Sequence, residues 1–167
     1  MKEILVSGGL VALIDDKDFA LVQGYSWNAC PGKNTTYAKA WVRGTYSPQK
    51  NIYLHRLILN APKGIQVDHQ NGDGLDCQRA NIRLASNGQN TCNARKHRIV
   101  HGNPPLSKFK GVSWQKTMNT WRARVYVAHH EVMLGYFDSE TAAALAYNEA
   151  AVRLYGQFAR LNDIMAE

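Results

Sequence analysis

Four residues in the middle of the chain have types and a spacing that suit hydrolysis of a phosphate ester. Asp68 and His69 are adjacent, Asn81 follows a polar loop rich in glycine, and Asn90 follows the segment IRLAS. Carboxylate and amide oxygens are ligands that a hard cation such as Mg²⁺ prefers, and phosphate oxygens and waters can complete its shell. A histidine titrates near neutral pH and can take a proton from water. Asp68 and Asn90 are therefore candidate metal ligands, and His69 is a candidate general base.

Asn81 suggests a different task. The loop QNGDGLDCQRAN is so polar that many of its backbone groups would lack partners unless a side-chain amide bridged them. We expect Asn81 to provide this bridge and so to hold His69 in place. The alternative for these residues is structural: an Asp-His pair can be a turn with a core histidine, and an asparagine near a helix start can be a cap.

The elements around these residues are predicted from local pattern. IQVDH and IRLAS have the composition of short strands, and SNGQNTCNARKH predicts a helix with Ser86 as its N-cap and basic residues at its far end. Alternation along the first strand places His69 on the side opposite Asp68, or at the bend where the strand ends. The order is therefore strand, long polar loop, strand, helix.

The first third of the chain predicts a scaffold of short strands and turns. Strand candidates are LVALID, TYAKAWVR and NIYLHRLIL, while DDKDFALVQGYSW predicts a brief helix that ends at Gly24. LHRLILNAP also has the character of one or two helical turns ended by Pro62.

The segment HRIVHGNPPLS contains one glycine and two prolines and predicts a linker. Beyond it, FKGVSWQ, TWRARVYVA and VMLGYFD are three strand candidates, and SETAAALAYNEAAVRLYG predicts a helix that begins at Asp138 or Ser139 and ends at Gly156. The expected apolar face of this helix consists of Ala143, Tyr147, Ala150, Ala151 and Leu154. In TWRARVYV, alternation puts Trp121, Ala123, Val125 and Val127 on the helix side and Arg122, Arg124 and Tyr126 on the other.

The distribution of charge indicates a polyanionic partner. The net charge is +7, the pI is near 9.4, and no Asp or Glu occurs from Cys77 to His130. A stretch of one sign attracts nucleic acid, although a solubilising surface is the alternative. The predicted DNA contacts are Arg79, Arg83, Arg95, Lys96, Lys110, Ser113, Gln115, Lys116, Arg122, Arg124 and Tyr126, with His55 and Arg56 as phosphate contacts.

Two resemblances extend these inferences. Asp68-His69, Asn81 and Asn90, preceded by YLHRLIL and followed by NARK, resemble the HNH endonucleases with a ββα-metal fold, most closely the phage-type homing endonucleases. The resemblance implies that His69 is the general base, that Asn81 orders the loop, and that Asp68 and Asn90 bind one ion per active site. Asn90 stands where the family name has its second histidine, which favours Mg²⁺ or Mn²⁺ over zinc.

Residues 107–162 resemble the plant ethylene-response-factor (APETALA-type) DNA-binding domain. The carrying segments are FKGVSWQKTMNTWRARV, LGYFDSETAAALAYNEAAVRLYG and FARLN. Glu131 and Met133 stand where plant members often place a base-contacting Arg and Trp, and Ser113 replaces an Arg. The resemblance therefore implies phosphate anchoring by Lys110, Lys116, Arg122 and Arg124, and the plant code of base readout does not carry over.

Together these features predict an α+β chain: a ββα-metal HNH nuclease domain with an N-terminal strand-rich scaffold at 1–97, a linker at 98–107, and a three-stranded antiparallel sheet packed on one α-helix at 108–162. The expected function is a site-specific nicking homing endonuclease acting on double-stranded DNA as a monomer, with a dimer as the alternative. Rival functions are a catalytically silent DNA-binding regulator and an RNA-binding or RNA-processing protein.

No membrane association is expected, because no run of about 18 apolar residues occurs, and the N-terminus does not read as a signal peptide. The three cysteines follow no zinc-knuckle or disulfide spacing. We therefore expect a cytoplasmic, DNA-associated protein in the host cell of a phage or mobile element.

Overall fold

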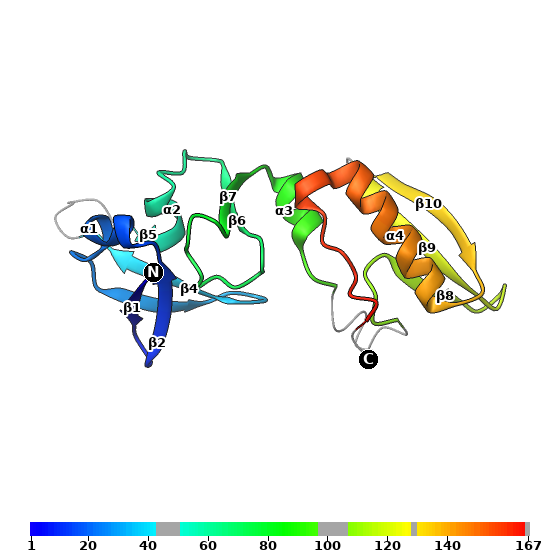
Figure 1. Cartoon of the computed structure of the whole chain (residues 1–167), viewed down its shortest axis with the longest axis horizontal. Coiled ribbons are helices and arrows are strands. Elements are labelled where there is room, and N and C mark those ends of the chain that lie inside the picture. Colours follow the sequence, from blue (N-terminus) through cyan, green and yellow to red (C-terminus); the bar gives the residue numbers. More distant parts are fainter. Residues whose placement is uncertain (43–50, 97–106, 128–129, 166–167) are drawn as a thin grey trace. The chain divides into compact units, whose positions relative to one another are not determined.

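The computed structural model describes residues 1–42, 51–96, 107–127 and 130–165, and it divides into two compact units, Met1–Asn90 and Thr91–Glu167 (Figure 1). Each unit is described separately. The expected linker at 98–107 lies outside the described residues except for Ser107, which is buried. No helix among the described residues is long and apolar enough to span a membrane.

The first unit is built on a five-stranded sheet in the order β2-β1-β3-β4-β5. Its strands are β1 (Lys2–Val6), β2 (Leu10–Ile14), β3 (Trp27–Pro31), β4 (Thr36–Trp41) and β5 (Asn51–Tyr53). β1 and β3 pair in parallel, and the other neighbours are antiparallel. Alternate residues of β1 and β2 are buried, as expected for strands with one face on the core.

Short helices cover the core of this unit. They are η1 (Asp16–Asp18), α1 (Phe19–Val22) and α2 (Leu54–Ile58), so the brief helix predicted before Gly24 is present. NIYLHRLIL is a strand for only three residues before the chain turns into α2, because Leu54 and Ile58, one helical turn apart, both enter the core. The core also contains Ile14, Val22 and Trp27.

The middle segment has the predicted order of elements. β6 (Gln66–His69) and β7 (Ile82–Ala85) form a two-stranded antiparallel sheet, and α3 (Asn87–Asn93) follows. Ser86 is the N-cap: its hydroxyl accepts from the Gln89 amide, and the Gln89 side chain accepts from the Ser86 amide. The division between the two units falls within α3.

The loop between β6 and β7 is tied to the five-stranded sheet. The Leu13 amide donates to the Leu75 carbonyl at 2.9 Å, and the Cys77 amide donates to the Leu13 carbonyl at 2.8 Å. The Gly74 amide donates to the Thr35 hydroxyl at 2.8 Å. These long-range bonds give the loop a defined position.

The second unit contains one sheet and one long helix. β8 (Val112–Gln115), β9 (Thr120–Val127) and β10 (His130–Phe137) form an antiparallel sheet in the order β10-β9-β8. α4 (Glu140–Tyr155) is capped by Ser139, whose hydroxyl accepts from the Ala142 amide, and it is followed by η2 (Gly156–Phe158). Its buried face consists of Ala143, Ala144, Tyr147, Ala150 and Ala151.

The prediction that Leu154 belongs to the buried face of α4 was wrong. Leu154 is 43% exposed. The helical stripe continues from Ala151 to Tyr155, which packs on the core and exchanges hydrogen bonds with the backbone of Tyr126. Tyr155 therefore occupies the sheet-facing position in the last turn.

Candidate active site and nucleic-acid interface

Asp68 and His69 leave opposite faces of β6, as strand alternation predicts. Asp68 lies opposite Arg83 in the register, and His69, the last residue of β6, lies opposite Ile82 of the core. Both side chains are buried. The hairpin therefore has a polar face that carries Asp68 and a core face that carries His69.

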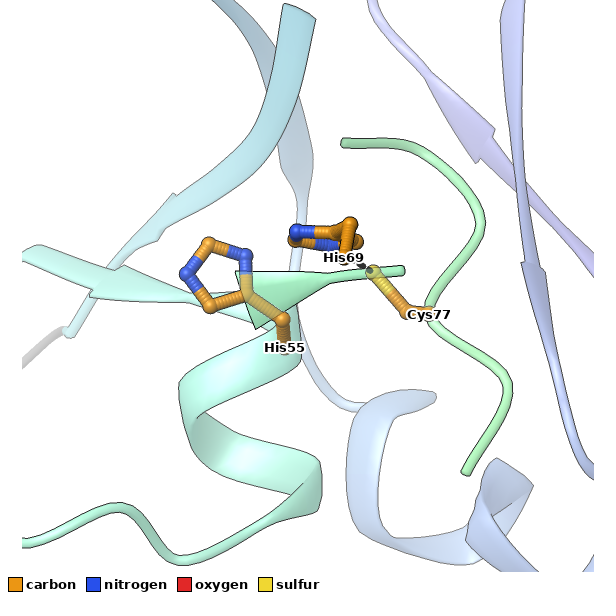
Figure 2. Close-up of side chains that lie close together, drawn as sticks. All are labelled: His55, His69 and Cys77. Carbon is orange, nitrogen blue, oxygen red and sulfur yellow. Dashed lines mark hydrogen bonds between the residues drawn. The ribbon is translucent and has the colours of Figure 1, made fainter. Parts of the chain in front are cut away.

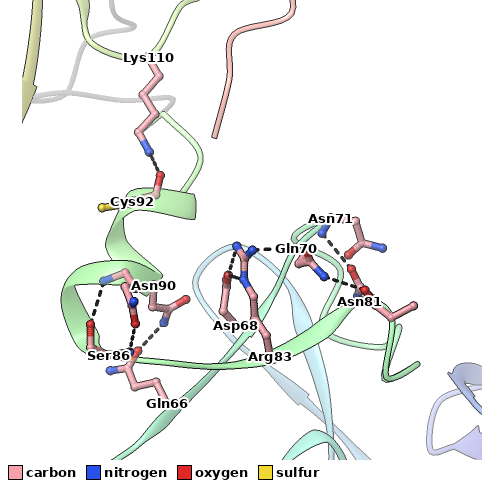
Figure 3. Close-up of polar contacts among 12 residues, drawn as sticks. Gln66, Asp68, Gln70, Asn71, Asn81, Arg83, Ser86, Asn90, Cys92 and Lys110 are labelled. Carbon is pink, nitrogen blue, oxygen red and sulfur yellow. Dashed lines mark hydrogen bonds and ion pairs between the residues drawn. The ribbon is translucent and has the colours of Figure 1, made fainter. Parts of the chain in front are cut away.

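The polar face collects the two predicted metal ligands. Arg83 Nε and Nη2 donate to Asp68 Oδ2 at 2.8 and 2.7 Å. The Asn90 amide donates to the side-chain oxygen of Gln66, which is two residues before Asp68 and thus on the same face (Figure 3). Asp68 and Asn90 offer oxygen donors of the type that Mg²⁺ prefers. Arg83, which is also a predicted DNA contact, binds one oxygen of the Asp68 carboxylate.

Asn81 makes the predicted bridge within the loop. Its side-chain oxygen accepts from the Asn71 amide at 3.0 Å (Figure 3). Its Nδ2 donates to the Asp76 carbonyl at 2.7 Å. One side chain therefore joins the first and second halves of the loop that follows His69.

The core face places His69 in a cluster that the sequence did not predict. Its Nε2 lies 4.0 Å from Cys77 Sγ, and its ring meets the His55 ring edge-on with centroids 4.9 Å apart (Figure 2). Tyr37 packs against both imidazoles. His55, predicted as a phosphate contact, is buried here at 8% exposure. No sequence spacing signals this cluster, because the fold of the loop brings Cys77 to the histidines.

Burial sets the protonation of this cluster. Desolvation lowers the pKa of His69. Desolvation, together with the nearby His69 imidazole, lowers the pKa of His55 to about 3. Burial also raises the pKa of the Cys77 thiol to about 12. At neutral pH both imidazoles are therefore uncharged, which is the form that accepts a proton or binds a metal.

Two other predicted contacts in this unit have internal partners. Arg56 donates to the carbonyls of Ile65, Ala61 and Pro62. Arg79 forms a bidentate ion pair with the buried Asp18, with contacts of 2.8 to 3.2 Å. Both guanidinium groups fasten the loops that surround the hairpin.

Two lysines of the second unit also bind backbone carbonyls. Lys96 Nζ donates to the carbonyls of Phe109 and Val112, and Lys110 Nζ donates to those of Cys92 and Ala94 (the Cys92 contact is in Figure 3). Burial lowers the pKa of each ammonium to about 8. Arg95 and Lys116, by contrast, are exposed.

The face of the second sheet that points away from α4 carries the predicted row of polar residues. Ser113 lies opposite Arg122, Arg124 opposite Met133, and Gln115 opposite Thr120. Along these strands the polar residues alternate with Val112, Ala123 and Val125, which point to the opposite face and are buried in cores that include residues of α4. The structure therefore brings Ser113, Gln115, Arg122, Arg124 and Tyr126 to one surface.

Glu131 lies on the neighbouring strand β10, opposite Tyr126. Its carboxylate accepts from the Tyr126 hydroxyl at 2.8 Å and from Arg124 at 2.5 Å, and it lies 4.0 Å from Arg122. The hydrogen bonds from Tyr126 and Arg124 lower the pKa of Glu131. One carboxylate thus serves both arginines.

Comparison with known proteins finds relatives of several kinds. The chain is 31% identical over 99 residues to protein 3.8 of Escherichia phage T7, covering 59% of this chain and 77% of that protein. It is 28% identical over 156 residues to the uncharacterized HNH endonuclease L560 of Acanthamoeba polyphaga mimivirus, covering 93% of this chain and 76% of that protein. No protein-family model and no solved structure matches.

The third kind of relative is a plant protein. An AP2/ERF and B3 domain-containing protein of Oryza sativa subsp. japonica is 45% identical over 56 residues, which cover 34% of this chain and 15% of that protein. The chain thus spans less than a fifth of the length of the plant relatives it matches.

Proposed function

The chain belongs to the family of protein 3.8 of Escherichia phage T7, and from this premise we propose that it is a metal-dependent DNA endonuclease of the HNH type. The observation that carries the proposal is the strand–loop–strand–helix segment, which puts Asp68 and Asn90 on one face of the hairpin and His69 at the end of β6. The similarity to a viral protein named as an HNH endonuclease, over 93% of this chain, supports it.

The residues have separate tasks in this proposal. Asp68 and Asn90 would hold one Mg²⁺ or Mn²⁺ ion, which supplies a Lewis acid to polarise the phosphate and stabilise the developing charge. Arg83 occupies one oxygen of Asp68, so an ion at this carboxylate shares it with a guanidinium. His69 is the general base, and its lowered pKa keeps the imidazole neutral at pH 7. Asn81 positions the loop that follows His69.

The second unit is proposed to bind the duplex. Plant relatives named as AP2/ERF proteins, one of them an ethylene-responsive transcription factor, support this role. Arg122, Arg124 and Lys116 would grip phosphates, since strands can lie in the major groove with arginines directed at the DNA. With one catalytic site per chain, the expected product of a monomer is a site-specific nick, and a double-strand break would require a dimer or two sequential events.

A second candidate function is a silent DNA-binding regulator. Two observations favour it: Asp68 is ion-paired with Arg83, and His69 is only 6% exposed. The ion pair reduces the access of a metal ion to Asp68, and burial reduces the access of water and substrate to His69.

The deciding experiment is conversion of supercoiled plasmid to open circle with Mg²⁺ or Mn²⁺, using several plasmids. We expect native protein to nick and a chelator to stop it. His69→Ala should lower the rate by about 10²- to 10⁴-fold. His130→Ala, at an exposed position of β10, is the matched control and should retain the native rate. Circular dichroism of each variant separates loss of the base from loss of the fold.

Duplex binding without cutting by native protein, across all plasmids and metals, would favour the regulator. Nicking by His69→Ala at the native rate would exclude His69 as the base.

A further inference from the structure

We propose that His55, His69 and Cys77, here called the His-Cys cluster, form a binding site for a transition-metal ion of the zinc type. The site is separate from the oxygen ligands Asp68 and Asn90, which lie on the other face of the hairpin, and it shares His69 with the proposed active site.

The geometry of the His-Cys cluster is close to that of a metal site. One ligand atom from each residue lies within 4.8 Å of the others, and Cys77 Sγ is 4.0 Å from His69 Nε2. Tetrahedral zinc, with a Zn–S bond of about 2.3 Å and a Zn–N bond of about 2.0 Å, requires an S···N separation of about 3.5 Å. Closing that pair around an ion therefore needs a movement of about half an ångström, which rotations of three side chains can supply.

An unsatisfied buried atom points to a ligand at this position. Among the described residues His55 Nδ1 has no hydrogen-bond partner, although the side chain is only 8% exposed. A buried polar atom without a partner costs free energy, and a metal bond would remove that cost. Tyr53 stacks on the His55 ring, with centroids 5.5 Å apart and an interplanar angle of 20°, and this fixes the plane of the imidazole.

The chemistry of the donors selects the ion. Two imidazole nitrogens and one thiol suit zinc or cobalt, whereas Mg²⁺ prefers oxygen ligands. On binding, the Cys77 S–H bond breaks, its proton passes to solvent, and the thiolate bonds to the ion, which remains divalent. Three protein ligands leave a fourth position for water.

Occupation of the site would have a consequence for catalysis, which rests on the proposed function. A zinc ion bonded to His69 removes the nitrogen lone pair that would take a proton from water. Zinc at the His-Cys cluster should therefore inhibit nicking that is supported by Mg²⁺.

Cobalt titration of the full chain tests the site without reference to activity. We expect metal-free native protein to bind one equivalent of Co²⁺, with a thiolate-to-cobalt charge-transfer band and the visible bands of tetrahedral cobalt. Zn²⁺ should displace these bands, and excess Mg²⁺ should not. Cys77→Ser should lose the charge-transfer band. Cys92→Ser and Cys30→Ser, which remove half-buried thiols elsewhere, should keep it.

Absence of the charge-transfer band in native protein, or its persistence in Cys77→Ser, would overturn the site. The native titration needs no substitution, so misfolding of a variant cannot obscure the result.

Inhibition is tested separately, with each rate compared to the same protein without zinc. Native protein should lose Mg²⁺-supported nicking at about one equivalent of Zn²⁺, and a chelator followed by Mg²⁺ should restore it. Cys77→Ser should need at least about tenfold more zinc, because loss of an outer-shell partner alone already costs about 10- to 100-fold in metal affinity. Equal sensitivity of both proteins would exclude inhibition through the cluster, while a protein that never nicks but binds cobalt would refute only the proposed function.

Discussion

At the scale of the residue, alternation along β6 gives two neighbouring side chains different surroundings. Asp68 contacts a guanidinium, whereas His69 contacts the ring of Tyr37, a second imidazole and a thiol. A hard cation and a soft one would thus find ligands on opposite faces of one short strand. Substitution of Asp68 should therefore change the response to Mg²⁺, and substitution of Cys77 should change the response to zinc or cobalt.

Asn81 allows a residue-scale prediction about the loop. Asn81→Ala removes both bridging bonds and should lower the free energy of unfolding by about 1–3 kcal/mol, because each hydrogen bond contributes about 0.5–1.5 kcal/mol. Asn81→Asp keeps the acceptor for the Asn71 amide and loses the donor to the Asp76 carbonyl. Hydrogen exchange should therefore accelerate at the Asn71 amide in Asn81→Ala and remain slow in Asn81→Asp. Equal exchange in both variants would contradict the bridge.

Lys96 allows a prediction about pH. Its pKa is about 8 in the folded second unit and near its usual 10.5 in the unfolded chain. Between pH 8 and 10.5 the unfolded chain binds more protons at Lys96 than the folded chain does, so the free energy of unfolding should rise with pH. This contribution to stability is lost as the pH falls from 10.5 to 8. Because Lys96 is only partly buried, solvent screening should reduce the gain from pH 7.5 to 9.5 to about 1 kcal/mol.

Lys96→Met should flatten this dependence. Urea unfolding of both proteins at the two pH values gives the difference, in which the titration of other groups such as Cys92 and Lys110 cancels. Parallel pH curves for the two proteins would show that Lys96 does not carry the effect.

At the scale of the element, the local sequence pattern was sufficient to predict the strands and helix caps that depend on neighbouring residues alone. β6, β7, the Ser86 cap of α3 and the Ser139 cap of α4 all follow from alternation and capping chemistry. The order of strands in the five-stranded sheet and the place of the loop do not, because backbone bonds between Leu13 and residues near Cys77 join distant segments. For the same reason the His-Cys cluster had no signature in the sequence.

Charged residues were the least predictable. The sequence predicts Arg79, Arg83, Lys96 and Lys110 as DNA contacts but gives no sign that each also binds a carboxylate or a carbonyl within its own unit. A count of basic residues predicts a field that attracts polyanions, but it does not show which of these residues already have partners within the protein. By contrast, the parity of β9 correctly separated Arg122, Arg124 and Tyr126 from the residues packed on α4.

Contact between β8 and α4 depends on one glycine. Gly111 has φ +76°, and a Cβ there would lie 2.0 Å from the ring of Tyr147, which is buried, and 2.6 Å from the Arg124 carbonyl. Gly111→Ala should destabilise the second unit by about 3 kcal/mol or more, because neither neighbour can move away cheaply. Gly156→Ala is the matched control: its φ is +52° with no atom within 4 Å of the added Cβ, and it should cost about 1 kcal/mol. Urea unfolding followed by fluorescence measures both, and equal losses would refute the steric argument.

At the scale of the whole molecule, the net charge of +7 overstates the basic surface available to DNA. Several predicted contacts are held internally, and Arg122 and Arg124 share Glu131. Suppose that Lys116, Arg122 and Arg124 each displace counterions from the duplex. A plot of the logarithm of affinity against the logarithm of salt concentration should then have a slope of about −2.7 or steeper. Affinity should then fall by at least about 40-fold between about 50 and 200 mM salt. A flat salt response, measured by fluorescence anisotropy with labelled duplex, would exclude phosphate anchoring.

Glu131 tests whether this surface of the second sheet is the DNA-binding face. Glu131→Gln removes the carboxylate that pairs with both arginines, so their charge becomes available to phosphates. We expect affinity for duplex DNA to rise on the order of tenfold at low salt, with a salt slope steeper by about 1. Glu149→Gln changes the net charge equally at an exposed position of α4, which packs against the opposite face of the sheet. When the two variants are compared at about 0.1 M salt, Glu149→Gln should change affinity only slightly, because screening weakens charges beyond a Debye length of about 10 Å. An equal rise in both variants would mean that DNA responds to total charge, and the face carrying Arg122 and Arg124 would have no special role in binding.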